Sequence, residues 1–131
     1  MEIGELKPQT RELEINHPGR DVPLGIRLTI LSMDDPKMQG VKRSLVNHRL
    51  NVEQKGKHLK ADDIDENLQT ILLSAILGWK WYNPTEDEAT QPKLEGDTDP
   101  EFCPRNVKKL LAHEWFRDQV NAGISDRAAF Y

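Results

Sequence analysis

The amino-acid sequence predicts a mainly helical α+β fold, with an N-terminal β-hairpin, about four helices and a long acidic loop before the last two helices. Three features favour this fold. Apolar residues alternate only near the N-terminus, they recur at helical spacing in two later stretches, and the segment between those stretches is acidic and contains prolines. The length of 131 residues fits one domain of ordinary size, so we expect residues 1–131 to form a single domain.

The β-hairpin is predicted over residues 12–31. Leu13 and Ile15 lie on one face of the first short run, and Ile26, Leu28 and Ile30 alternate in the second. A Pro-Gly pair lies between the two runs, and these residue types favour a turn. A lone hairpin is only marginally stable in water, so we expect this one to pack on helices or on another copy of the chain.

Two helices are predicted to follow. A basic helix is expected over residues 35–55, because an acidic cap precedes Pro36, and proline suits the first helical position. A second helix is expected over residues 62–78, where apolar residues recur at spacings of three and four. Its broad apolar stripe indicates the central core helix, and Gly78 supplies a C-terminal stop.

Residues 79–103 are predicted to form an acidic loop, because this stretch has many acids, several prolines and no apolar period. We expect the aromatic residues at its start to be anchored and its acidic middle to be free. Two short helices are then predicted over residues 104–125, and Pro104 suits the first position of the first one.

The distribution of charge is more informative than the formal net charge of −4. Residues 37–60 hold seven basic groups and one acidic group, whereas residues 61–101 hold two basic and eleven acidic groups. Such blocks can steer association between copies or fold back onto each other, or they can be solvated faces that keep the protein soluble. The residues expected to carry self-association are Lys42, Arg43 and Arg49 in the basic helix and Asp87 and Glu88 in the acidic loop.

No reactive site is recognisable in the sequence. The four histidines fall in different elements without metal-type spacing, and Cys103 is the only cysteine. The chain has no glycine-rich phosphate loop and no nucleophile motif. The acids at the start of the 62–78 helix are explained by the helix dipole. We therefore expect no enzyme activity, no catalytic residue, no metal and no cofactor.

The sequence also disfavours a membrane or nucleic-acid partner. The longest apolar run, residues 71–77, is far too short to span a bilayer, and the N-terminus has no apolar leader, so a soluble intracellular protein is expected. The basic stretch 37–60 could face phosphates, but the pI is near 5.6 and no aromatic residue is interleaved with the basic ones. Nucleic-acid binding is therefore expected to be absent, although it remains an alternative.

The C-terminal third carries a pattern of apolar and turn residues. The pattern is Gly78-Trp79, then Phe102-x-Pro104-x-Asn106-Val107-x-x-Leu110-Leu111, then Trp115-Phe116-x-x-Gln119-Val120, then Asp126-Arg127-x-x-Phe130. Near the N-terminus stand Ile15-x-His17-Pro18 and Leu24-Gly25-Ile26. Together these residues resemble the tail assembly chaperones of long-tailed (siphovirus-type) bacteriophages.

This resemblance implies a non-enzymatic role in the host cytoplasm. Such chaperones bind the long helical tape measure protein, keep it soluble until tail tube subunits polymerise around it, and tend to self-associate. They are absent from the mature virion. They are made in a short form and in a longer, frameshifted form whose extra domain recruits the tail tube protein. The resemblance implies that this sequence is the short form.

The aromatic residues all lie after residue 78, and aromatic side chains are favoured anchors at interfaces. Trp115 and Phe116 are expected in the core, whereas the terminal position of Phe130 and Tyr131 favours an exposed contact. The residues expected to contact the partner are Trp79, Trp81, Tyr82, Phe130 and Tyr131. Two other functions stay open: a structural phage tail or head-completion adaptor, and a small nucleic-acid-binding regulator. The regulator would use Lys42, Arg43, Arg49, Lys55 and Lys57.

Overall fold

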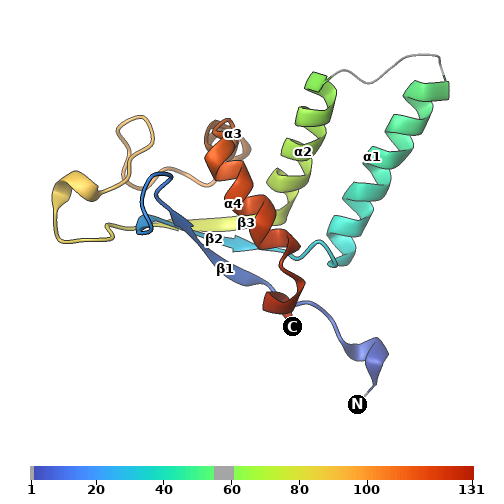
Figure 1. Ribbon diagram of the computed structural model, residues 1–131, viewed down its shortest axis with the longest axis horizontal. Coiled ribbons are helices and arrows are strands. Elements are labelled where there is room, and N and C mark those ends of the chain that lie inside the picture. Colours follow the sequence, from blue (N-terminus) through green and yellow to red (C-terminus); the bar gives the residue numbers. More distant parts are fainter. Residues whose placement is uncertain (1, 55–60) are drawn as a thin grey trace.

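The computed structural model describes the backbone of residues 2–54 and 61–131 and the side chains of residues 2–47 and 67–131. Within these ranges the chain has a mixed α+β fold with three antiparallel strands and four α-helices (Figure 1). The strands are β1 (Arg11–Asn16), β2 (Pro23–Ile30) and β3 (Ile76–Trp81). The helices are α1 (Pro36–Gln54), α2 (Ala61–Ala75), α3 (Pro104–Leu111) and α4 (Glu114–Ser125). Short 3-10 helices are η1 (Ile3–Glu5), η2 (Glu88–Thr90) and η3 (Arg127–Phe130).

The sheet has the order β1-β2-β3, so β2 is central and pairs antiparallel with both neighbours. Leu28 lies opposite Leu13 on one side and opposite Trp79 on the other, which places these three side chains on one face. The register shifts once in each pair, between Ile15 and Asn16 and between Thr29 and Ile30.

The strand β3 corrects the prediction for residues 62–78 and 79–103. The helix α2 ends at Ala75, and the next six residues form a strand rather than the last helical turn and the start of the loop. Gly78 is therefore not a helix stop but lies in the strand opposite Thr29. Trp79 and Trp81 alternate with smaller or polar residues, and pairing with β2 selects this two-residue period over the helical one.

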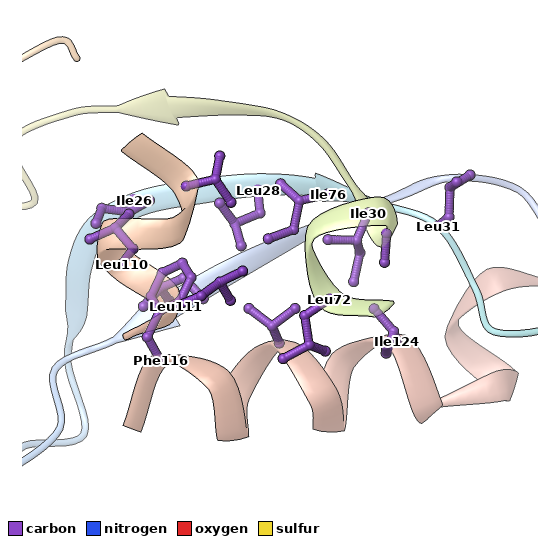
Figure 2. Close-up of a cluster of buried hydrophobic side chains, with 14 of the residues drawn as sticks. Ile26, Leu28, Ile30, Leu31, Leu72, Ile76, Leu110, Leu111, Phe116 and Ile124 are labelled. Carbon is purple, nitrogen blue, oxygen red and sulfur yellow. The ribbon is translucent and has the colours of Figure 1, made fainter. Parts of the chain in front are cut away.

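One face of the sheet is covered by helices and the other is not (Figure 1). The core lies between the sheet and helices α2, α3 and α4, and Figure 2 shows residues of all four elements converging there. On the open face, Glu14 pairs with Arg27 at 3.1 Å. The helix α1 packs against α2 beside the sheet and is attached at its start by Met38, which is fully buried.

Candidate functional site

The acidic connection (residues 82–103) is folded onto the start of β2. The Tyr82 backbone N–H donates a hydrogen bond to the Gly25 carbonyl oxygen at 2.9 Å. Gly25 has a φ of +104°, and a Cβ there would lie 2.3 Å from the Tyr82 carbonyl oxygen and 2.9 Å from Cδ of Pro92. Only glycine accommodates both this φ and this close approach, so Gly25 permits the connection to dock.

The middle of the connection is held by its own hydrogen bonds. The Asn83 side-chain amide donates to the Asp87 carbonyl oxygen at 3.0 Å, and the Asp87 backbone N–H donates to Oγ1 of Thr85 at 3.1 Å. The Asp87 carboxylate accepts from the Ala89 N–H at 2.9 Å. The expectation of a free acidic middle is therefore wrong, because side-chain oxygens satisfy the backbone groups of this turn. We call its exposed carboxylates, Glu86, Asp87 and Glu88, the acidic tip.

The aromatic residues at the start of the connection anchor it to the sheet. Nε1 of the half-buried Trp79 donates to the Pro100 carbonyl oxygen at 3.0 Å, and the Trp79 ring meets Phe102 and Trp81 edge-on at 5.3 and 5.6 Å. Trp81 is only 9% exposed. Tyr82 is half-buried beneath the guanidinium of Arg27, at 5.2 Å from its ring centre. Trp79, Trp81 and Tyr82 thus lie together, but much of their surface is used within this chain.

The two terminal aromatic residues have different environments. Phe130 is 1% exposed and lies in the core, so the expectation of an exposed contact there is wrong. The helix η3 turns the chain back, and the Arg11 guanidinium lies 5.6 Å from the Phe130 ring centre. Tyr131 is 58% exposed and remains accessible to a partner.

An ion pair fixes the helix η3 to the segment before α1. Nε and Nη2 of Arg127 donate to the two carboxylate oxygens of Asp34 at 2.7 and 3.2 Å. The hydrogen bond and the charge of Asp34 raise the pKa of Arg127 above its ordinary value. This contact positions the C-terminal segment and engages the charge of Arg127 within the chain.

Two clefts flank the seam between α1 and α2. The first, the Gly40 cleft, has a volume of about 400 Å³. Its walls are Lys37, Gly40, Val41, Ser44, Leu45, Thr70 and Ser74. The second, the Val46 cleft, has a volume of about 190 Å³. Its walls are Lys42, Leu45, Val46, Asn67 and Ile71.

The apolar side chains of α1 that line the two clefts are only partly covered by the rest of the described chain. Val41 and Leu45 are half-buried, and Val46 is 54% exposed. A Cβ at Gly40 would meet no atom within 4 Å, so the surface beside it is open. These clefts were not predicted from the sequence, because their walls come from two helices whose relative placement depends on the fold.

The residues expected to carry self-association do not meet within one copy. Lys42 and Arg43 are exposed on α1, whereas Asp87 and Glu88 are exposed in the acidic tip. Figure 1 shows α1 and the tip at opposite ends of the molecule. Arg49 falls within α1, but its side chain, like those of Lys55 and Lys57, lies outside the described residues. The described part of the chain shows no ion pair of Lys42 or Arg43, so the acidic tip does not fold back to neutralise them.

A further cleft separates the β1–β2 turn from the acidic connection, with a volume of about 540 Å³. Its walls are His17, Arg20, Val22, Pro23, Leu24, Pro84, Thr85, Ala89 and Thr90. Nδ1 of His17 accepts from the Gly19 N–H at 3.0 Å, which orients the ring. Sequence analysis could not find this cleft, because its two walls come from distant segments.

Among the described side chains, no group of three or more histidine, cysteine or acidic residues is placed to hold a metal ion. None of the helices, as far as they are described, is both long and apolar enough to cross a bilayer. Near the end of the acidic connection, Lys109 forms an ion pair with Glu95 at 2.7 Å. This hydrogen bond and charge lower the pKa of Glu95.

Several residues of the C-terminal pattern of apolar and turn residues have structural roles. The Asn106 side-chain amide donates to the Glu101 carbonyl oxygen at 2.8 Å, Gln119 binds the backbone of Asn16, and Phe130 fills the core. These residues of the pattern stabilise the fold, and the pattern includes none of the wall residues of the two clefts beside α1. No family model matches the chain, and neither a curated protein nor a solved structure matches it.

Proposed function

We propose that this protein is a non-enzymatic tail assembly chaperone of a long-tailed bacteriophage, which binds the tape measure protein and keeps it soluble during tail assembly. The resemblance of residues 78–130 to such chaperones suggests the role. The observation on the structure that supports it best is the Gly40 cleft, an open apolar surface that nothing in the described chain fills.

A helix laid in a groove is a common way to recognise an amphipathic partner, and its apolar anchors recur every three or four residues. Val41 and Leu45 supply an apolar floor. Gly40 and Ser44 lie one helical turn apart on the same flank of α1, and their small side chains allow a partner backbone to approach. Lys37 adds a positive charge at the rim.

In this proposal the protein acts by shielding. Exposed apolar stripes cause aggregation, and several chaperone copies along one tape measure protein cover such stripes through many weak contacts. The exposed Tyr131 and the half-buried Trp79 are additional contact residues. A longer, frameshifted form recruits the tail tube protein, and the chaperone stays in the host cytoplasm when the virion is complete.

The test is co-expression with the tape measure protein of the same phage, with the soluble fraction of that protein as the readout. We expect the wild-type chain to raise the soluble fraction severalfold, and Gly40→Glu to abolish most of this effect by placing a charged chain in the cleft. Gly40→Ala, which adds only one methyl group, is the matched control and should retain the effect. An unchanged soluble fraction with the wild-type chain overturns the proposal.

A second measurement separates the chaperone from a structural adaptor. Mass spectrometry of purified virions should detect the tape measure protein but not this chain. A stoichiometric amount of the chain in finished particles contradicts the chaperone role and supports the adaptor.

A further inference from the structure

We propose that copies of this protein associate head to tail, with the acidic tip of one copy docked on the Lys42 and Arg43 side of α1, at the Val46 cleft, of the next. The occupant of this surface is thus a second copy of the same chain. The inference goes beyond the proposed function and rests on the charge distribution and geometry of this chain alone.

The acidic tip is presented as a rigid group. The hydrogen bonds among Asn83, Thr85 and Asp87 fix the backbone of the turn, so little conformational entropy is lost when it binds. The carboxylates of Glu86 and Glu88 are exposed and make no hydrogen bond or ion pair with any described residue. They are therefore available to a cation on another molecule.

The opposite end of the molecule presents the complementary charge. Lys42 and Arg43 lie on a helix, are exposed, and have no acidic partner in the described part of the chain. The Val46 cleft beside them has a volume of about 190 Å³, which is room for a small apolar side chain. Ala89, which is exposed next to Glu88, supplies such a side chain.

The separation of the two surfaces determines the kind of assembly. The acidic tip and α1 lie at opposite ends of the molecule (Figure 1), so the two cannot meet within one copy. A contact between different surfaces of identical copies is heterologous, and it leaves one free end of each kind on every dimer. Addition therefore continues and gives an open chain or a closed ring.

Exposed ion pairs are individually weak and are screened by salt. Association should therefore depend on protein concentration, appear at low salt and disappear at about 1 M salt, where the Debye length is about 3 Å. Complementary charge at the two ends also disfavours tip-to-tip and helix-to-helix contacts, because those bring like charges together.

A charge-swap experiment with the purified full-length chain, after nuclease treatment, tests the inference by sedimentation velocity. The basic-end variant carries Lys42→Glu and Arg43→Glu, and the acidic-end variant carries Glu86→Lys and Glu88→Lys. We expect wild type to form species larger than a dimer at low salt and each variant to be monomeric. An equimolar mixture of the two variants should regain assembly beyond the dimer, because the tip of each variant is complementary in charge to α1 of the other.

The variant with all four substitutions should regain assembly, because its two ends are again complementary. Lys80→Glu and Glu12→Lys, on the open face of the sheet, are controls that each reverse a single charge, and they should assemble like wild type. Circular dichroism verifies that every variant is folded.

The inference is overturned if wild type is monomeric at low salt, if a one-end variant assembles like wild type, or if the folded four-substitution variant stays monomeric. Assembly that disappears on nuclease treatment also overturns it, in favour of nucleic-acid binding by the basic face. Because the tape measure protein is absent from the charge-swap experiment, the outcome of that experiment is independent of the solubility test.

Discussion

The carboxamide of Gln119 binds both backbone groups of Asn16. Its Oε1 accepts from the Asn16 N–H at 2.7 Å, and its Nε2 donates to the Asn16 carbonyl oxygen at 2.9 Å. Asn16 lies where the β1–β2 register shifts, and its partner there is Pro23, which has no N–H to donate. The side chain of α4 thus replaces a missing strand neighbour and attaches the last helix to the edge of the sheet.

Replacing Gln119 with Glu should destabilise the protein by about 1–2 kcal/mol near neutral pH. The carboxylate still accepts from the Asn16 N–H, but it has no proton for the Asn16 carbonyl oxygen and repels it. Protonation restores a donor, so the difference from wild type should shrink below about pH 4. Urea unfolding of both proteins across this pH range measures the difference.

Gln9→Glu is the matched control, since Gln9 is exposed just before β1 and its side chain has no hydrogen bond to any described residue. It should change the free energy of unfolding by less than about 0.5 kcal/mol. Equal effects of the two substitutions on the free energy of unfolding would show that the hydrogen bonds of Gln119 to Asn16 do not stabilise the protein.

Two helical glycines should respond oppositely to alanine. A Cβ at Gly40 would meet nothing within 4 Å, so Gly40→Ala should stabilise the protein by about 0.5–1 kcal/mol through helix propensity. A Cβ at Gly123 would lie 2.8 Å from Cδ2 of Leu13 and 3.3 Å from Cδ1 of Ile30. Because α4 packs closely on β1 and β2 there, Gly123→Ala should destabilise by about 1–2 kcal/mol. Chemical denaturation of the two variants provides the comparison, and a stabilising Gly123→Ala contradicts the close packing.

Sequence reasoning located the helices well where local signals are strong. Proline stands at the first position of α1 and of α3, and the observed bounds agree closely with the predicted ones. It failed at β3 because residues 71–77 form one apolar run interrupted only by Ser74, in which helical and strand periods cannot be separated. Only the pairing of Gly78 with Thr29 and of Trp79 with Leu28 resolves the boundary.

The candidate surfaces could not be predicted because they are formed by contacts between residues that are far apart in the sequence. Composition predicted a free acidic loop, yet the loop is folded because Tyr82 and Pro92 meet Gly25, which is distant in sequence. Phe130 was expected to be exposed because it is near the end of the sequence, but η3 directs it into the core. The basic and acidic segments could be located in the sequence. That they lie at opposite ends of the molecule could be seen only in the folded structure.

The ion pair between Lys109 and Glu95 should make a pH-dependent contribution to stability. Lys109 lowers the pKa of Glu95 from its ordinary value of 4.5, chiefly by a hydrogen bond and also by its charge. The contribution is therefore complete above pH 4.5 and is lost as the pH falls through the lower pKa of the folded state. Lys109→Gln should raise the Glu95 pKa towards 4.5. NMR titration of the Glu95 carboxyl carbon measures this, and Lys108→Gln, next in sequence, should leave that pKa lowered.

Docking of the acidic connection should depend on Gly25 far more than on Gly96, the other glycine with positive φ among the described residues. Gly96 has a φ of +86° and nothing within 4 Å of a Cβ, so Gly96→Ala introduces only backbone strain, about 1 kcal/mol. Gly25→Ala introduces a similar strain and also places a Cβ 2.3 Å from the Tyr82 carbonyl oxygen, which forces the connection to move. We expect a loss of about 2–4 kcal/mol in the free energy of unfolding.

Hydrogen exchange locates the change: the amide of Tyr82, bonded to Gly25 at 2.9 Å, should exchange much faster in Gly25→Ala and little faster in Gly96→Ala. Equal protection of Tyr82 in the two variants would contradict the role of Gly25 as the docking point of the connection.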